Sequence, residues 1–212
     1  MKILKKSVLF GVVAAAISAT AHAGLVNDGF KTGNLTGWTA NLNGGSATAV
    51  TSNTTTYSPV ATYTPVEGNY FLAIASGAAN VWQTVSQTVS LSVGDTLSGW
   101  VAFDWGDYPS FYDGVSIAIY DNLNNAFSIY YDDGVGKPSG YNGPWDTWSY
   151  TADTTGTYRL EYAVRNTLDG GGPNQTYGYF DANIAAVPEP ASLALVGLAL
   201  AGLGASRRKR SA

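Results

Sequence analysis

Carboxylates and aromatic rings are the side chains of this chain that could do chemistry. Its 212 residues include no cysteine, and the only histidine is His22. A disulfide framework, a cysteine nucleophile, a Cys/His zinc site and a Ser-His-Asp triad in the middle of the chain are therefore excluded. Oxygen ligation and carboxylate chemistry remain.

One group of aspartates could hold a metal ion. It consists of Asp104, Asp107 and Asp113, set among Trp105, Tyr108, Phe111 and Tyr112. Clustered carboxylates on a loop suit calcium, which takes about six to eight oxygen ligands, although the spacing is not that of an EF-hand. Two interpretations stay open: a site for a structural calcium, or a solvated acidic hairpin tip.

Aromatic residues are the main indication of ligand binding. All 6 tryptophans and all 14 tyrosines lie between residues 24 and 186. Sugar-binding surfaces stack aromatic faces on the C–H-rich side of a sugar ring, while Asp, Asn and Arg bond its hydroxyls. Aromatic residues also favour strands for packing reasons, so core or cross-strand packing is the alternative. The candidates, on polar strand faces or in expected loops, are Trp82, Trp100, Tyr108, Tyr112, Tyr141, Trp145 and Trp148.

Catalysis by carboxylates is disfavoured. A glycosidase needs two opposed carboxylates about 5–9.5 Å apart, and residues 24–186 contain only Glu67 and Glu161 besides scattered aspartates. Glu161 shares one strand face with Arg159 and Arg165, so we expect an ion pair there. The sequence therefore predicts no enzyme and no catalytic residues.

The elements that must position these side chains are short strands. In the clearest one, every charge falls on one face, and the other face is formed by Tyr158, Leu160, Tyr162 and Val164. Period-2 alternation also marks residues 81–93, 97–105 and 115–120, and after a turn the set Phe127, Ile129 and Tyr131. This pattern predicts half-buried antiparallel strands.

No helical apolar stripe of useful length interrupts these strands. About nine to eleven candidate strands with Gly/Asn/Asp turns predict an all-β fold, a jelly-roll β-sandwich. The segment Asn41–Pro59, rich in Asn, Gly, Ser and Thr, is expected to be a mobile loop.

Charge divides the chain into three parts. The chain has a formal charge of −4, but residues 24–186 carry four basic and fourteen acidic side chains, a balance of −10. A body this acidic will not bind nucleic acid by neutralising phosphates. Its length fits one domain with a real core.

The N-terminal part, residues 1–23, has the order of a secretory signal peptide. Three lysines precede the apolar run Val8–Ile17, which is short for a membrane span. Ala21 and Ala23 then form a small-x-small cleavage site, so the mature chain should begin at Gly24. An uncleaved anchor helix is the alternative.

The C-terminal part, residues 187–212, has three pieces in order. Val187, Pro188, Glu189 and Pro190 interrupt the backbone pattern, because neither proline can donate a hydrogen bond. Ala191–Ala205 is uncharged and spans roughly 22 Å as a helix, somewhat short of a full bilayer core. The basic cluster of Arg207, Arg208, Lys209 and Arg210 should stop translocation and stay in the cytoplasm.

This tail resembles the PEP-CTERM sorting tail: Pro-Glu-Pro, a transmembrane helix and a basic cluster. The resemblance implies an exosortase-type enzyme as partner, which would cleave the tail. It also implies transient anchoring in the cytoplasmic membrane, then release to the cell surface or the extracellular space. An ordinary C-terminal anchor is the alternative.

The body also resembles secreted jelly rolls of the galactose-binding and carbohydrate-binding type. The opening Val26–Gly33 with Gly37-Trp38 is similar to their "N-G-x-F-E-x-G … G-W" motif, and Tyr179–Ile184 to their closing "D-N-V" strand. Such modules often hold a structural calcium between these strands, and Asp181 matches the closing carboxylate. Lys31 stands where the motif has Glu, so a Lys31–Asp181 ion pair is an equal interpretation.

The sequence thus predicts a non-enzymatic, exported surface or matrix protein that associates with extracellular polysaccharide through its β-sandwich. A purely structural surface protein without a sugar site is the alternative, and a carboxylate-based glycosidase is less favoured. A patch of two or three exposed Trp or Tyr side chains would favour the first.

Overall fold

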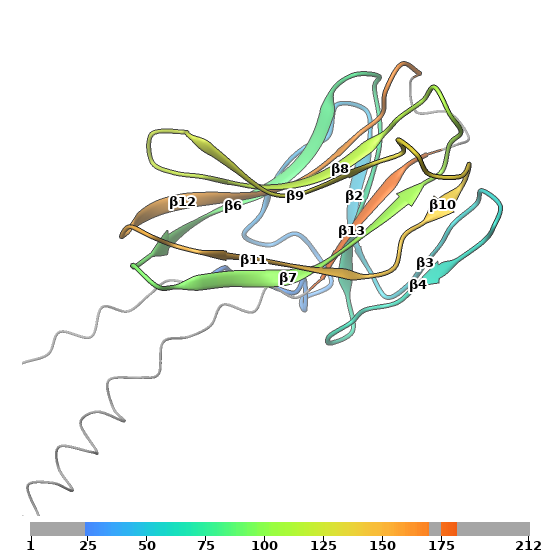
Figure 1. Ribbon diagram of the computed structural model, residues 1–212. Coiled ribbons are helices and arrows are strands. Elements are labelled where there is room, and N and C mark those ends of the chain that lie inside the picture. Colours follow the sequence, from blue (N-terminus) through green and yellow to red (C-terminus); the bar gives the residue numbers. More distant parts are fainter. Residues whose placement is uncertain (1–23, 170–174, 182–212) are drawn as a thin grey trace, which may run out of the picture. The chain divides into compact units, whose positions relative to one another are not determined.

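The computed structural model describes residues 24–169 and 175–181, and these residues form thirteen β-strands and no helix (Figure 1). One sheet has five strands, in the spatial order β1 (Thr39–Asn41), β6 (Trp82–Leu91), β12 (Gly156–Arg165), β8 (Gly114–Tyr120) and β9 (Ala126–Asp133). The other has six, namely β10 (Tyr141–Asn142), β7 (Thr96–Trp105), β13 (Tyr177–Asp181), β5 (Phe71–Ala75) and β2 (Ser46–Val50), with β11 (Asp146–Thr151) also pairing β7. A short hairpin joins β3 (Asn53–Thr54) and β4 (Thr62–Tyr63).

The order of the strands along the chain is that of a jelly roll. The chain crosses between the two sheets from β1 to β2, at each step from β5 through β8, from β9 to β10, and at each step from β11 through β13. All neighbouring strands within the sheets are antiparallel. The all-β sandwich predicted from the alternation is confirmed.

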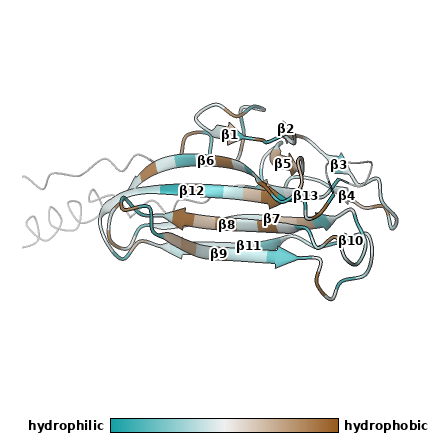
Figure 2. Cartoon of the chain, turned by 90° about the horizontal axis from the view of Figure 1, so that it is seen from above, coloured by the Kyte–Doolittle hydropathy of each residue, from teal (hydrophilic) through white to brown (hydrophobic). Residues whose placement is uncertain are grey.

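The core lies between the two sheets, where the predicted strand faces meet. On β12, Tyr158, Leu160, Tyr162 and Val164 are at most 3% exposed, as the alternation predicted. Buried and less buried positions alternate along most of β6 and β12, and the hydropathy also varies along both strands (Figure 2). On β6 the pattern ends with the strand, because the flanking Val81 and Val93 are exposed.

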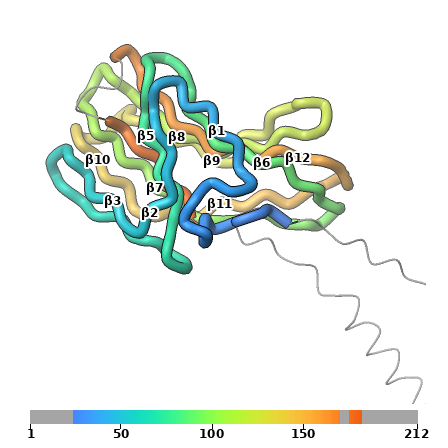
Figure 3. Tube along the Cα trace, turned by 180° about the vertical axis from the view of Figure 1, so that it is seen from behind, coloured from blue at the N-terminus to red at the C-terminus, as the bar shows by residue number. Residues whose placement is uncertain are grey.

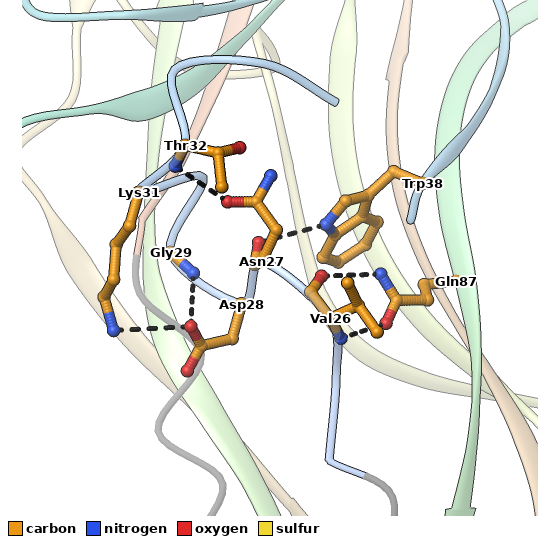
Figure 4. Close-up of polar contacts among 8 residues, drawn as sticks. All are labelled: Val26, Asn27, Asp28, Gly29, Lys31, Thr32, Trp38 and Gln87. Atoms are coloured by element: carbon orange, nitrogen blue, oxygen red, sulfur yellow. Dashed lines mark hydrogen bonds and ion pairs between the residues drawn. The ribbon is translucent and has the colours of Figure 1, made fainter. Parts of the chain in front are cut away.

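Tyr162 packs between the first and last segments of the β-sandwich. Its ring stacks on Phe180 of β13 at 4.4 Å and on Trp38 of the opening motif at 5.3 Å. Phe30 packs against Trp38 at 5.1 Å. The opening segment is also fixed by Gln87, whose amide binds both the N–H and the C=O of Val26 (Figure 4). The two passages that carried the jelly-roll resemblance therefore meet in the core.

Of Phe127, Ile129 and Tyr131, which were expected on one face, only Tyr131 lies on the other one. Ile129 packs against the core, and Phe127 pairs with the buried Ile119. A β-bulge shifts the register of β9 against β8, so that Ile117 pairs with Tyr130 while Ala118 pairs with Ser128. A one-residue shift moves side chains to the opposite face. Tyr131 consequently lies on the outer face and is 51% exposed.

The segment Asn41–Pro59 is not simply a loop. It contains β2, which pairs along β5 (Figure 3), and β3, which pairs with β4. The inward residues of β2 include Ala47 and Ala49, which pack against the core. Their small side chains give a weak hydrophobic signal in a hydroxyl-rich segment, which explains the wrong expectation.

In the part of the chain that the structure describes, no helix is long and apolar enough to cross a membrane. The expected signal peptide, transmembrane helix and basic cluster lie outside the described residues, as do the four residues of the sorting motif.

Candidate functional site

The outer face of the six-stranded sheet is largely covered by a second hydrophobic cluster. It packs beneath the β3–β4 hairpin and consists of Tyr63, Phe71, Ala73, Ala102 and Tyr179, with Val50, Ala61, Trp145 and Tyr177 at its margin. Tyr63 and Tyr179 approach to 4.3 Å between ring centroids. The cluster fills the space in which a ligand could otherwise lie on the centre of this sheet.

A cleft remains where this cover ends, on β7 and β11. It measures about 290 Å³ and is lined by Ser98, Gly99, Trp100, Thr147, Trp148 and Ser149. Thr147 pairs with Trp100 and Ser149 with Ser98 in the strand register. Because paired residues share a face, one half-buried indole and three hydroxyl-bearing side chains lie together on the outer surface.

Only two of the seven candidate aromatic residues, Trp100 and Trp148, line this cleft. The expectation that both rings are exposed is wrong for Trp148. Trp100 is partly exposed, as a stacking ring must be. Trp148 is 5% exposed and packs edge-on against Tyr162 in the main core at 6.0 Å. Trp148 thus contributes to the cleft wall but is not an exposed platform.

The other five candidates are scattered. Trp145 belongs to the margin of the second cluster, edge-on to Phe71 at 5.7 Å. Tyr108 and Tyr112 are exposed on the loop between β7 and β8. The Lys137 ammonium lies over the Tyr141 ring at 4.2 Å, and Trp82 lies on the five-stranded sheet beside Arg165 of the neighbouring strand β12. The structure therefore does not gather these rings into one patch.

The aspartates of the β7–β8 region do not form a solvated tip. Asp104, Asp107 and Asp113 are 2%, 0% and 0% exposed. Asp104 accepts a hydrogen bond from the Tyr179 hydroxyl at 3.1 Å. Asp113 accepts from the Thr167 N–H at 2.7 Å and from the Thr176 hydroxyl at 2.5 Å. Their burial follows from these inward contacts.

Burial also changes how these carboxyls titrate. Loss of hydration raises the pKa of Asp104 and of Asp113 to about 7 each. It raises the pKa of Asp107 to about 6, with the Asp169 carboxylate beside it adding to the rise. Desolvation disfavours the charged form of a carboxyl group. All three therefore titrate closer to neutral pH than an exposed aspartate.

The calcium hypotheses gain no support from the described residues. Among residues 24–169 and 175–181, no three acidic or histidine side chains are grouped as metal ligands. One carboxylate oxygen of Asp181 accepts the backbone N–H groups of Val66 and Glu67. Lys31 pairs with Asp28 at 3.3 Å (Figure 4) and not with Asp181 as in the alternative interpretation.

The outer face of the five-stranded sheet is open and polar. Its central strand β12 presents Arg159, Glu161 and Arg165. Glu161 forms the expected ion pair with Arg159 and accepts the Tyr120 hydroxyl at 3.0 Å. The Arg159 guanidinium lies 3.8 Å from the Tyr120 ring centroid. Glu161 is thus occupied as a structural partner.

Sequence reasoning missed several residues of these surfaces. Thr147 and Ser149 belong to the cleft, and their alternation with Trp148 and Tyr150 was a usable signal of an exposed face. Arg165 was considered only as a neighbour of Glu161. Its environment depends on three other strands, which no local pattern identifies.

Residues 186–209 match the family model described as the PEP-CTERM protein-sorting motif, so the chain carries that motif. No curated protein matches the sequence.

Similar folds occur among solved structures. TmCBM61 in complex with β-1,4-galactotriose has 17% identity and a TM-score of 0.45, over 74% of this chain and 92% of that one. The K3 cleaved adhesin domain of Lys-gingipain from Porphyromonas gingivalis has 16% identity and a TM-score of 0.48, over 77% and 97%. The CBM22-1 xylan-binding domain of Paenibacillus barcinonensis Xyn10C has 15% and 0.43, over 78% and 95%. Similarity at this level does not identify a ligand.

Proposed function

We propose that this protein is exported under its PEP-CTERM motif and associates with extracellular polysaccharide through the cleft on β7 and β11. The motif indicates export with processing by an exosortase-type enzyme. The body would then act at the cell surface or in the extracellular matrix as a non-enzymatic binding module.

The observation that carries the binding proposal is the composition of the cleft. Trp100 offers a partly exposed apolar ring next to the hydroxyl-bearing Ser98, Thr147 and Ser149. Ligand sites are concave and mostly apolar, with a few polar groups that fix orientation. A sugar has complementary surfaces, because its C–H face packs on an aromatic ring and its hydroxyls exchange hydrogen bonds.

A binding role fits the carboxylates better than a catalytic role. The two glutamates of the body belong to different parts of the fold. Glu161 is held by Arg159 and Tyr120, and Glu67 lies in the loop whose backbone binds Asp181. Neither is placed in the cleft at Trp100. A purely structural surface protein is the second candidate, favoured by the extensive aromatic packing of Trp145 and Trp148.

The binding proposal is tested with the polysaccharide fraction of the native host's extracellular matrix. In affinity gel electrophoresis of the full-length chain, Trp100→Ala should weaken binding at least about tenfold, which is ~1.4 kcal/mol. Tyr108→Ala, which removes an exposed ring outside the cleft, is the matched control. Equal binding by both variants would show that the cleft is not the binding site. A wild-type chain that binds no polysaccharide would favour the structural alternative.

The export proposal is tested by mass spectrometry of the surface or secreted form from the native host. The mature chain should begin at Gly24 and lack Ala191–Ala212. A surface-exposed form that still ends at Ala212 would leave only a simple membrane anchor. Deleting the basic cluster Arg207–Arg210 should let part of the chain pass the membrane uncleaved.

A further inference from the structure

Four basic side chains lie in residues 24–169 and 175–181, and three of them are paired with acids. Lys31 pairs with Asp28, Lys137 with Asp132 at 2.8 Å, and Arg159 with Glu161. For Arg165, no carboxylate of the described residues lies within ion-pair distance. In a body with fourteen acids and four bases, an arginine without an acidic partner is unexpected, because acids are available almost everywhere else.

Arg165 also lacks a hydrogen-bond partner for one of its guanidinium N–H groups. Its Nε is buried and donates to no partner among the described residues. The side chain is only partly exposed, so water does not fully replace the missing acceptor. Because Nε is closed to solvent, a ligand can reach only the terminal N–H groups of this guanidinium.

Aromatic rings lie on both sides of this guanidinium. Trp82 of β6 pairs with Arg165 in the register, and the Arg165 Cζ is 5.0 Å from the Trp82 ring centroid. On the other side, Arg165 pairs with Gly114 of β8. The Tyr131 ring of β9 covers that glycine, since a Cβ there would lie 3.5 Å from the Tyr131 hydroxyl and 3.6 Å from its Cε2. The Arg165 side chain therefore lies between the rings of Trp82 and Tyr131 on the outer face of the five-stranded sheet.

The neighbouring acids are already engaged. Asp133 pairs with Gly114 in the register, but it accepts the Tyr131 hydroxyl at 3.1 Å and the Val135 N–H at 2.9 Å. The next residue of β12 on the same face as Arg165 is Ala163, which pairs with Thr84 of β6 and Ser116 of β8. Asp133 keeps its negative charge, whereas the paired neighbours Thr84, Ser116 and Gly114 on this face are small and uncharged, so an incoming sugar chain would meet little steric obstruction there.

We propose that Arg165, between Trp82 and Tyr131, is a binding site for a carboxylate-bearing sugar of an acidic polysaccharide. A guanidinium offers a planar fork of donors that matches a carboxylate with two hydrogen bonds. The flanking rings provide apolar faces for the sugar ring. The site lies on the other sheet from the Trp100 cleft and goes beyond the function proposed above.

The negative charge of the body opposes an acidic ligand, so binding must be local. At about 0.15 M salt, interactions beyond ~8 Å between exposed charges are largely screened. Contacts at Arg165 act over shorter distances and are screened less. The assay is therefore run at that ionic strength.

The test compares polygalacturonate, its methyl ester and neutral galactan in affinity electrophoresis of the full-length chain. The methyl ester keeps the sugar backbone and removes the carboxylate charge. Wild-type protein should bind polygalacturonate at least about tenfold more tightly than the ester, because only the acid engages the guanidinium in charge-assisted bonds. Arg165→Gln should abolish this preference and leave galactan binding unchanged. Lys31→Gln, which removes one positive charge elsewhere, should retain it.

Equal wild-type binding of the acid and the ester would overturn the inference, and this comparison needs no variant to fold. Equal losses in Arg165→Gln and Lys31→Gln would overturn it as well, since net charge alone would then explain the effect. If galactan binds through Trp100 while the acid has no advantage, the proposed function stands and this inference fails. If none of the three polymers and no matrix polysaccharide binds, both fail.

Discussion

The two outer faces of the sandwich are built from the same kind of alternating strands but meet different surroundings. On the six-stranded sheet, Phe71 and Ala73 of β5, Ala102 of β7 and Tyr179 of β13 point outward and form a hydrophobic cluster with Tyr63 of the β3–β4 hairpin. On the five-stranded sheet, the outward residues of β6 and β12 are mainly Thr, Ser and charged residues, and they remain open. One face has become a second core with a cleft at its end, and the other is a polar surface.

A strand face that points away from the core is therefore not always exposed to solvent. Ala102 and Asp104 point outward on β7 and yet are 0% and 2% exposed. Covering a face strengthens its packing but perturbs any carboxyl that it encloses, because burial disfavours charge.

The largest expected effect is on the covered face. Phe71→Ala removes a ring that is 0% exposed and packs on Trp145 and Tyr179, so it should lower the free energy of unfolding by about 3–5 kcal/mol. Thr88→Ala, on the open face of β6, should change it by no more than about 0.5 kcal/mol. Urea denaturation of the two variants measures both values. Similar midpoints would show that the second cluster contributes little.

A second comparison separates the two faces of a single strand. Leu160→Ala opens the main core, where Leu160 is 0% exposed, and should cost about 2–5 kcal/mol. Thr157→Ala on the outer face of the same strand should cost little. Equal shifts in melting temperature would contradict the assignment of faces on β12.

Two buried aspartates, Asp104 of the covered face and Asp113 before β8, should also make stability depend on pH. Asp104 and Asp113 have folded-state pKa values raised to about 7, against about 3.9 in an unfolded chain. Between these values the folded state holds protons that the unfolded state has released. The free energy of unfolding should therefore fall as the pH rises from about 4 to 7, and level off above.

Asp104→Asn tests the origin of that dependence. An asparagine can still accept the Tyr179 hydroxyl but carries no charge, so the loss of stability between pH 5 and pH 8 should become smaller. Asp113 should keep part of the slope. Asp153→Asn, at an exposed position, is the control. An unchanged slope in Asp104→Asn, measured by thermal melts at several pH values, would contradict the role given to this carboxyl.

The smallest expected effect is that of a chelator. Because the described residues contain no group of three acidic or histidine ligands, EDTA should shift the melting temperature of the exported protein by no more than roughly two degrees. A metal bound only to the folded state would raise stability by mass action. A fall of more than roughly ten degrees would restore calcium to the account.

Much of the fold could be predicted from the sequence, because the core faces alternate strictly. Leu160 and Val164 of β12, like Ile117 and Ile119 of β8, follow a period of two that only a half-buried strand requires. The bulge in β9 could not be predicted, since one extra residue reverses the face of Tyr131 without altering the local composition. The covered outer face could not be predicted either, because it joins the β3–β4 hairpin to β7 and β13, which are distant from it in the sequence.

The candidate site was only partly predictable for the same reason. Trp100 was a sound candidate because it lies on the polar face of its strand. Trp145 and Trp148 looked equivalent in the sequence, but Trp145 packs at the margin of the second cluster and Trp148 packs in the main core. The missing partner of Arg165 can be recognised only when the neighbouring strands are known.

Hydroxyl-radical footprinting reports the exposure of individual side chains and is the most direct test of polysaccharide binding at the Trp100 cleft. The exported protein is oxidised with and without saturating matrix polysaccharide, and the modified residues are quantified by mass spectrometry. The account predicts that the ligand protects Trp100 and leaves the exposed Tyr108 and Tyr112 unchanged. Unchanged oxidation of Trp100 in a complex shown to be saturated would contradict binding at the cleft.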